Sequence, residues 1–487
     1  MGCAINIASW LKLNQLSLEK LITRDNREAV RKIIFAHSVP PNMLGISDCI
    51  GSLLNSINAL SEEPEIIRAE ILKTGKLLVL IQQATGSHIK SGACPEFPMA
   101  STAVKKKTVI FLSSCPEFWG GSEELWSGVA LRFARSGHNI SVVKTRVDGT
   151  NPNIRILKES CTQVEDYNDH RDVLQRLKAR LLPGSWLRDA PDSGYWWLSK
   201  FLRHQRPDLV VISQGENFDG LKFAGPCLDN GLPYVIVSQK ACDFRWPKDQ
   251  VRNLMQRFYT GAQRAYFVSD HNRELTEYQL GTRLSNAEVV RNPFLTPVSE
   301  ALPWPTSVAG LYRLACLARL NIKEKGQDVL LQVLSYDKWR ARPIHVDFFG
   351  IGVDRDALVA MADLLALTNV SFEGFTSDIT GVWQTHHALV LPSRCEGLPL
   401  SVIEAMLCGR PVIATDVGGT AEILTDNRTG FLAWAATPQL LDEALERAWQ
   451  RRHDWQSIGR LAAKSIRTHV PADPIATFAD KIMELLR

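Results

Sequence analysis

The sequence predicts an α/β protein with two parallel-sheet domains behind a helical N-terminal extension. Three observations support this prediction. Residues 387–432 alternate buried strand, helix, strand and helix, which is the pattern of a parallel sheet with crossover helices. A second stretch beginning at residue 108 repeats strand, glycine loop, helix and strand. Residues 1–90 instead carry apolar side chains at helical spacing.

The first hundred residues differ in pattern from the rest of the chain. Apolar residues recur at helical spacing in LSLEKLITRDNREAVRKIIFAH and in IIRAEILKTGKLLVLIQQ. Glycine, serine and proline then gather at 86–102, which predicts a linker and places the end of the extension at residue 103. This block is either a module that docks a partner or substrate, or a helical extension packed on the next domain. Both interpretations stay open.

Composition argues against several classes of function. The 487 residues include 56 Lys+Arg and 52 Asp+Glu, and this net charge of +4 without a long basic run predicts no nucleic-acid partner. No apolar run reaches the length of a transmembrane helix, and the first residues lack the basic region of a signal peptide, so we expect a cytoplasmic protein. The ten cysteines are scattered without a C-x-x-C pair, so we expect reduced thiols.

The first α/β domain is expected over residues 104–294. A short β-rich run beginning at Thr108 leads into Gly120-Gly121, a helix and the next strand. The stretch 170–208 is basic and aromatic; it either contacts a membrane surface or is an ordinary amphipathic helix with a solvated basic face, and we favour the second. Further strands are expected at 209–213, 234–238, 265–268 and 288–290.

The second α/β domain is expected over residues 295–470, after a proline-rich hinge. Its first strand ends at Arg319, and Lys325 falls just before the next helix. A fork-shaped donor and a compact cation on adjacent loop ends suit a pair of phosphates. The sequence at 354–356 matches a D-x-D metal motif, but Asp354 is better explained as the N-cap of the helix that follows. We therefore expect no metal site.

The most informative stretch is the helix PLSVIEAMLCG, residues 399–409, with the loop before it. The helix is apolar on nearly every face, so Glu404 should be buried and should need a partner from outside the helix. The N–H groups at its start, where Pro399 suits the first position, form a site for phosphate. Glu404 lies about 7 Å further along the axis, roughly the distance from a diphosphate to the ribose of the same nucleotide. Glu396 would then lie beside the group on the far phosphate. The alternative is a capped helix whose Glu404 pairs with a remote arginine.

Glu396 and Glu404, with seven residues between them, resemble the paired-glutamate motif of retaining glycosyltransferases of family 4. The surrounding LPSRCEGLPLSVIEAMLCGRPVIATDVGGTAEIL is similar to that family's donor-site signature almost throughout. The similarity is clear over 310–435 and weaker over 107–295. It implies the GT-B fold, in which two Rossmann-like parallel-sheet domains face each other across a cleft. In that fold the last helix, here 471–487, crosses back to the first domain.

The resemblance also implies an activity. This activity is the metal-independent transfer of a sugar, with retention of configuration, from a nucleotide-diphosphate sugar to a hydroxyl-bearing acceptor. A UDP- or GDP-sugar is the expected donor, and no cofactor is expected. Arg319 and Lys325 match the family's diphosphate ligands and Glu396 its sugar-binding glutamate, so these three are the expected catalytic residues. The expected donor-binding residues are Glu404, Gly397, Leu398, Pro399, Gly120, Gly121, Gly374 and Phe375.

One position departs from the family's pattern. The family places a histidine that contacts the transferred sugar at the end of the strand that reads VIVSQK here, where this chain has Gln239 and Lys240. Either one of them takes over the contact, or the sugar is oriented differently. Two rival functions stay open: a nucleotide-sugar epimerase or hydrolase of the same fold, and a non-catalytic scaffold that binds nucleotide sugars. Peripheral contact with the inner face of a membrane would suit a lipid-linked acceptor.

Overall fold

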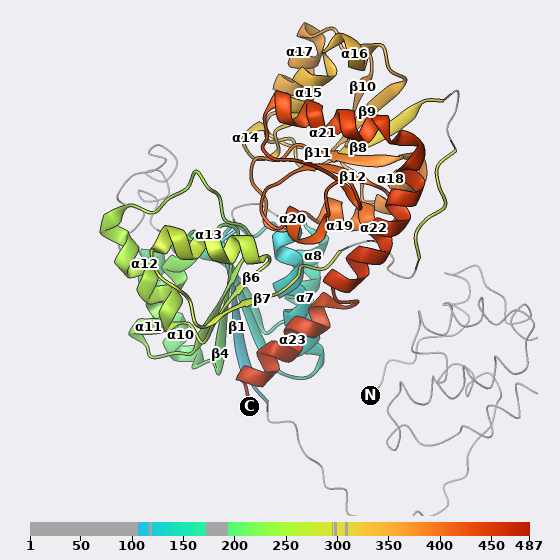
Figure 1. Ribbon diagram of the computed structural model, residues 1–487. Coiled ribbons are helices and arrows are strands. Elements are labelled where there is room, and N and C mark those ends of the chain that lie inside the picture. The colour runs from blue at the N-terminus through green and yellow to red at the C-terminus, as the bar shows by residue number, and fades with distance from the viewer. Residues whose placement is uncertain (1–105, 116–118, 172–192, 295, 297–299, 307–309) are drawn as a thin grey trace, which may run out of the picture. The chain divides into compact units, whose positions relative to one another are not determined.

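The fold is seen in a computed structural model that describes residues 106–487 except 116–118, 172–192, 295, 297–299 and 307–309 (Figure 1). The helical extension and linker expected at 1–103 lie outside the described residues, as does most of the basic, aromatic stretch at 170–208. Within the described part of the chain, no helix is both long and apolar enough to cross a membrane.

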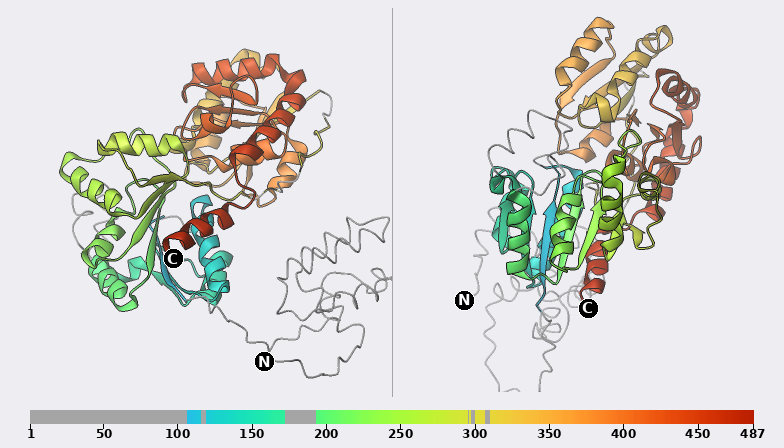
Figure 2. Two further views of the ribbon diagram at one scale, coloured as in Figure 1. Left: turned by 60° about the horizontal axis from the view of Figure 1, so that its bottom comes forward. Right: turned by 90° about the vertical axis from the view of Figure 1, so that its left-hand side faces the viewer.

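The N-terminal sheet has seven parallel strands in the order β3-β2-β1-β4-β5-β6-β7. The expected strands are confirmed, with shifts of one residue at some ends. Every residue of the central strands β4 and β5 is buried, because helices cover both faces of the sheet (Figure 2). The strands are β1 Thr108–Ser113, β2 Asn139–Lys144, β3 Gln163–Asp166, β4 Leu209–Gln214, β5 Tyr234–Ser238, β6 Arg264–Phe267 and β7 Ala287–Val289.

The helices on the two faces of this sheet make two separate cores. Strand β1 sends Val109 and Phe111 into the core that contains α7, and Ile110 and Leu112 into the core that contains α10 and α11, as the period of two requires. The helices are α7 Gly121–Arg135, α8 Pro152–Ser160, α10 Ser193–Gln205, α11 Ala224–Asp229, α12 Asp249–Gly261 and α13 Asp270–Leu280, with 3-10 turns at Tyr167–His170 and Leu221–Phe223.

The C-terminal sheet has six parallel strands in the order β10-β9-β8-β11-β12-β13. Its strands are β8 Tyr312–Leu317, β9 Ile344–Phe349, β10 Val370–Gly374, β11 Ala388–Leu391, β12 Val412–Thr415 and β13 Gly430–Ala433. The crossover helices are α14 Ile322–Lys325, α15 Gln327–Leu334, α16 Asp337–Arg340, α17 Arg355–Leu364, α18 Ile379–Thr385, α19 Leu400–Leu407, α20 Thr420–Ile423, α21 Pro438–Gln450 and α22 Trp455–His469, with a 3-10 turn at Arg452–Asp454.

The last helix, α23 (Pro474–Leu485), packs on α7 of the N-terminal sheet (Figure 1). Phe478, Ala479 and Ile482 are buried in the same core as Val109. A Cβ on Gly128 of α7 would stand 2.5 Å from Ile475, so the glycine lets the two helices approach closely. The chain therefore enters the C-terminal sheet after β7 and returns to the N-terminal sheet at its end.

Two local expectations need correction. Asp354 is the N-cap residue of α17, as expected, but its side chain makes no capping hydrogen bond there; Asp354 Oδ2 instead accepts a hydrogen bond from Ile322 N of α14 at 2.8 Å. The reason is that the β9–α17 loop lies against the β8–α14 loop, where a Cβ on Gly352 would stand 2.1 Å from Leu320 O. Pro399 has extended backbone (ψ 117°) and is the N-cap of α19, one residue before the first helical position.

Candidate active site

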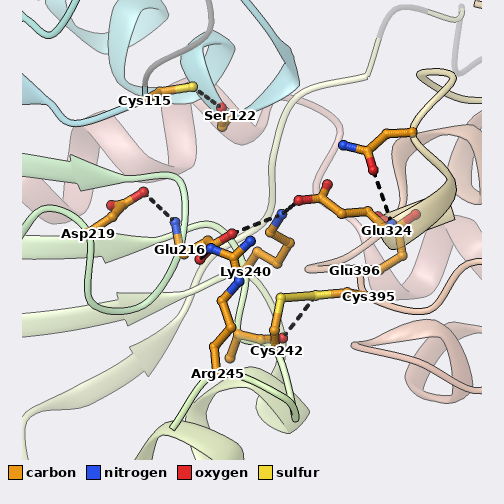
Figure 3. Close-up of polar contacts among 12 residues, drawn as sticks. Cys115, Ser122, Glu216, Asp219, Lys240, Cys242, Arg245, Glu324, Cys395 and Glu396 are labelled. Carbon is orange, nitrogen blue, oxygen red and sulfur yellow. Dashed lines mark hydrogen bonds and ion pairs between the residues drawn. A yellow bond between two sulfur atoms is a disulfide. The ribbon is translucent and has the colours of Figure 1, made fainter. Parts of the chain in front are cut away.

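Several of the expected site residues lie where the loops at the carboxyl ends of the two sheets touch, and Figure 3 shows two of them, Lys240 and Glu396. A Cβ on Gly397, in the loop between β11 and α19, would stand 1.9 Å from Gln239 O at the end of β5. A Cβ on Gly121, at the start of α7, would stand 2.9 Å from Leu400 Cδ1 of α19. The carboxyl ends of parallel strands are where ligands bind in open α/β sheets. Close approach between the two domains therefore requires glycine at 397, whereas at Gly121 only the flexible end of the Leu400 side chain comes close.

Glu396 is held by an ion pair and a hydroxyl group. Lys325 Nζ lies 2.6 Å from Glu396 Oε1, and Ser393 Oγ donates to the same oxygen at 2.7 Å. Ser393 is fixed in turn, because its main-chain oxygen accepts from Thr415 Oγ1 of β12 at 2.5 Å. The Glu396 side chain is 9% exposed and that of Lys325 13% exposed. The carboxylate therefore has one orientation, and the cation that was expected to bind phosphate already faces an anion.

Arg319 and Lys325 lie close together in sequence after β8, but not quite as expected: the strand ends at Leu317 rather than Arg319, and Lys325 is the last residue of the short helix α14, two residues before α15. Arg319 Nη2 lies 3.2 Å from Glu324 Oε2, and Arg319 O accepts from Gln327 Nε2 at 2.7 Å. Nearly half of the Arg319 side chain is exposed. Gly326, with φ +61°, ends α14, and its Cβ would stand 2.1 Å from Pro392 O. A left-handed glycine thus sets the position of Lys325 against the strand that precedes Glu396.

Glu324, which sequence reasoning did not single out, connects the two sheets. Its Oε1 accepts from Lys240 Nζ at 2.8 Å, and Lys240 also lies 3.6 Å from Glu216 (Figure 3). The main-chain oxygen of Glu324 accepts from the N–H groups of Arg394 (2.8 Å) and Cys395 (3.1 Å). Glu324 therefore supports the backbone that carries Glu396 and also receives a cation from the N-terminal sheet. The sequence did offer a signal for Glu324, because it is an acidic residue within a loop that is otherwise rich in cations.

The charges around Glu324 keep it ionised. Burial raises the pKa of its carboxyl group, but Lys240, Lys325 and Arg319 lower it by more, so the pKa lies below its ordinary value. Glu324 is therefore a fixed negative charge between three cations at neutral pH.

Gln239 and Lys240 lie at the junction, in different environments. Gln239 is buried; its Oε1 accepts from Asn292 Nδ2 at 2.6 Å, and its Nε2 has no hydrogen-bond partner among the residues that the structure describes. Lys240 extends the other way to Glu324 and Glu216. The side chain that crosses between the sheets is therefore that of Lys240.

Glu404 is buried (4% exposed) on α19, and every neighbour from Val402 to Leu407 is buried with it, as expected. The loop before this helix is supported by the Gly418-Gly419 turn. Gly418 has φ +55°, and Gly419 N donates to Gly397 O at 2.7 Å. A Cβ on Gly418 would stand 2.4 Å from the main-chain oxygens of Glu396 and Gly397, so this turn admits only glycine.

A buried ion pair supports the glycine loop at the start of α7. Glu123 and Lys144 are both buried and lie 3.4 Å apart, and Ser113 Oγ donates to Glu123 Oε1 at 2.9 Å. Burial raises the pKa of Glu123 although Lys144 and Ser113 lower it. The pair joins β1, β2 and α7 directly behind Gly120 and Gly121. Sequence reasoning missed it because the two residues are on different elements.

Two carboxylates on the loop after β4 were also missed. Asp219 accepts from Ser114 Oγ at 2.5 Å and from Glu216 N at 3.0 Å, and burial raises the pKa of Asp219 to about 6. Glu216 pairs with Arg245 as well as with Lys240. Their position could have indicated a site, because both residues follow a buried strand and so lie at the carboxyl end of the sheet.

Gly374 and Phe375 lie at the far edge of the C-terminal sheet. Gly374 is the last residue of β10 and Phe375 follows it; β10 is the edge strand and is separated from β8 by β9. Gly374 has φ +76° and its oxygen accepts from Gly350 N at 2.7 Å, while Phe375 is 73% exposed.

Among the described residues, no group of three or more histidine, cysteine, aspartate or glutamate side chains is placed to hold a metal ion.

The expectation of reduced thiols is wrong for Cys242 and Cys395, which form a disulfide bond. They are 153 residues apart, but the loop after β5 and the loop before α19 bring their Cα atoms to 5.7 Å. Spacing along the sequence cannot show such a meeting, because it depends on how the two sheets pack. The other described cysteines are free thiols: Cys115, Cys161, Cys227, Cys316 and Cys408.

Comparison with known proteins was made by sequence and by structure. The family model described as "Glycosyl transferases group 1" matches residues 312–451. A D-rhamnosyltransferase, WbpZ, of Pseudomonas aeruginosa is 26% identical over 221 residues, which cover 43% of this chain and 56% of the relative. A D-inositol 3-phosphate glycosyltransferase of Paenarthrobacter aurescens is 35% identical over 86 residues, covering 18% and 21%. The chain thus matches only about half, or less, of the length of these curated relatives.

Solved structures match over both sheets. Anabaena Alr3699/HepE in complex with UDP-glucose has a TM-score of 0.60 at 18% identity, covering 78% of this chain and 99% of that one. Sucrose-phosphate synthase of Thermosynechococcus elongatus has a TM-score of 0.60 at 14% identity, covering 78% and 99%. These similarities confirm the expected fold of two Rossmann-like domains.

Proposed function

We propose, from the premise that residues 312–451 are a domain of the glycosyl transferases group 1 family, that this chain is a glycosyltransferase. It would move a sugar from a nucleotide-diphosphate sugar to a hydroxyl-bearing acceptor, without a metal and with retention of configuration. Two neighbouring contacts carry the proposal: Arg319 pairs with Glu324, and the next residue, Lys325, pairs with Glu396 in the loop before α19.

The leaving group of this reaction is the nucleotide diphosphate. Negative charge grows on its phosphate oxygens as the bond to the sugar breaks, and fixed donors aimed at that charge stabilise the transition state. Arg319, Lys325 and the first N–H groups of α19 are the donors available here. In the structure these two cations already pair with Glu324 and Glu396, so an incoming diphosphate would share each cation with a carboxylate.

Glu396 would bind the sugar. Its carboxylate is oriented by Ser393 and Lys325, and it would hold sugar hydroxyls close to the anomeric carbon and support the positive charge that develops there. Glu404 would bind the ribose hydroxyls, and Gly374 and Phe375 would border the base. Because Anabaena HepE is seen with UDP-glucose, a UDP-sugar is the first donor to test, followed by a GDP-sugar.

Lys240 or Gln239 would contact the transferred sugar or the acceptor in place of the family's histidine. Lys240 fits this role better than Gln239, because its ammonium group lies within the charged cluster that also contains Glu324 and Arg319.

The test has two steps. A thermal-shift panel of UDP-, GDP- and ADP-sugars should give one nucleotide that raises the Tm, and Glu396→Gln should keep that shift. Release of nucleotide from the chosen donor is then measured with and without soluble sugar and lipid-linked acceptors, and NMR of the product reports the anomeric configuration. Turnover that depends on an acceptor, with retained configuration, is expected. Donor consumption without any acceptor would support the epimerase or hydrolase, and binding without turnover would support the scaffold.

A further inference from the structure

The disulfide bond between Cys242 and Cys395 joins the two sheets directly beside the proposed site (Figure 3). Cys242 follows Lys240 by two residues in the loop after β5, and Cys395 is the residue before Glu396. Both cysteines are buried, with 1% and 3% of their surface exposed. The main-chain N–H of Cys395 donates to Glu324 O at 3.1 Å. The cross-link therefore ties the backbone of Glu396 to the opposite domain.

The neighbouring contacts between the same sheets are reversible. Lys240 pairs with Glu324, and Glu422 of α20 pairs with Arg291 and accepts from His271 N at 2.9 Å. Ion pairs and hydrogen bonds of this kind break and re-form as domains move. A covalent bond with a Cα–Cα distance of 5.7 Å keeps the two loops together until it is reduced.

The packing at this point leaves no room for a substrate between the two loops. A Cβ on Gly397 would stand 1.9 Å from Gln239 O and 2.8 Å from Val268. Glu396 is only 7% exposed in this arrangement, so these loops are expected to separate when a donor binds and when the nucleotide leaves. Oxidation should therefore slow turnover and reduction should restore it.

We propose that Cys242 and Cys395 form a redox-modification site that locks the two domains together, a proposal that rests on the proposed function for its effect on turnover. A small dithiol is the reductant. One of its thiolates attacks a sulfur of the protein disulfide to give a mixed disulfide, and its second thiolate then displaces the remaining protein sulfur. The products are two protein thiols and the cyclic disulfide of the reductant, so two electrons and two protons pass to the protein.

The experiment uses the full chain, oxidised with glutathione disulfide or reduced with dithiothreitol. Alkylation and peptide mass spectrometry measure the fraction that contains the Cys242–Cys395 cross-link, and hydrogen exchange measures opening of the segments 240–246 and 394–400. Nucleotide release measures turnover. Cys242→Ser removes the cross-link, and Cys161→Ser is the matched control, because Cys161 is a partly exposed free thiol at the end of α8.

In the wild type we expect the oxidised chain to turn over about tenfold more slowly than the reduced chain, with slower exchange in both segments. Cys242→Ser should match the reduced wild type under both conditions, and Cys161→Ser should respond as the wild type does. Absence of the cross-linked peptide after oxidation, or equal exchange in both states, would overturn the lock. If no acceptor or donor is turned over but the cross-link still slows exchange, the lock stands and the proposed function fails.

Discussion

The two sheets contribute to the proposed site in different ways. On the C-terminal sheet, Arg319, Lys325 and Glu396 come from two short segments and are fixed by neighbours of the same domain, such as Ser393 and Gln327. On the N-terminal sheet, Glu216 is held by Arg245 and Lys240 of its own domain, and Lys240 also reaches Glu324 of the other domain. The C-terminal domain therefore carries its site residues within short local segments. The N-terminal domain contributes to the site only where the two domains meet.

This difference separates two kinds of experiment. Substitutions on the C-terminal sheet should change the chemical step itself, because these side chains face the charges that develop in the reaction. Substitutions on the N-terminal sheet should act through the alignment of the two domains and have smaller effects. The predictions below test this ordering.

The largest effect is expected from Glu396→Gln. The variant keeps the size of the side chain but loses the charge beside the anomeric carbon, so kcat should fall about 10²- to 10³-fold while the nucleotide still binds. Glu404→Gln is the matched control, because ribose binding is nearly equal in the ground and transition states, and it should chiefly raise the KM for donor. Steady-state kinetics at varied donor concentration measure kcat and KM for both variants. A loss of kcat in Glu404→Gln but not in Glu396→Gln would mean that the roles assigned to the two glutamates are exchanged.

The next effect is expected from Arg319→Ala and Lys325→Ala. Each should lose about 2–4 kcal/mol of transition-state stabilisation, measured as kcat/KM, because each removes a charge-assisted contact to the leaving group. Lys325→Ala also leaves Glu396 without its cation, so Lys325→Ala combined with Glu396→Gln should cost less than the sum of the two. Strict additivity in that cycle, or unchanged kinetics in the single variants, would remove the pair from the site.

A smaller effect is expected from the contact between the sheets. Lys240→Met and Glu324→Gln should each lower kcat/KM about tenfold, and their coupling energy should be about 1–2 kcal/mol. Lys240→Arg should recover part of the loss. Lys338→Met is the control, because Lys338 makes a Lys–Asp pair of the same 2.8 Å length with Asp442, away from the junction, and it should leave kcat/KM unchanged. Equal losses in Lys240→Met and Lys338→Met would mean that neither pair aligns the site.

The smallest effect on activity is expected from two aspartates, Asp219 and Asp347, whose pKa values shift in opposite directions and which should therefore have opposite effects on stability. Burial raises the pKa of Asp219 to about 6, so the folded chain binds more protons than the unfolded chain at moderately acidic pH. The free energy of unfolding should therefore fall as the pH rises from about 4 to 6. Asp219→Asn should abolish that dependence.

Asp347, on β9, should show the reverse. Burial raises its pKa, but hydrogen bonds from His386, Ser371 and Arg313 lower it by more, so the pKa lies well below its ordinary value. Its stabilisation is present above about pH 4 and is lost as the pH falls below that value. Asp347→Asn should thus destabilise the chain at pH 7 and lose less at pH 3. Denaturant unfolding from pH 3 to 8 measures both aspartates, and the same sign of dependence for the two would contradict the assignment.

Sequence reasoning succeeded where the pattern was local. The strand–loop–helix unit around Glu396 and the buried apolar helix around Glu404 follow from periodicity alone, and so do most strands of both sheets. It failed where a partner comes from a distant segment. The Asp354 side chain accepts from Ile322 N of α14 rather than from its own helix because two loops pack together, and Cys395 meets Cys242 only because the two sheets pack together.

The return of α23 to α7 has a consequence for how the protein can be divided. Topologically, residues 312–470 are an insert within the N-terminal domain, since that domain is completed only by residues encoded after the insert. Truncation after β7 would leave the side chains of Val109 and Phe111 without the cover that Phe478 and Ile482 give them. A chimaera that exchanges donor specificity between relatives should therefore replace the insert and keep both flanking segments from one parent.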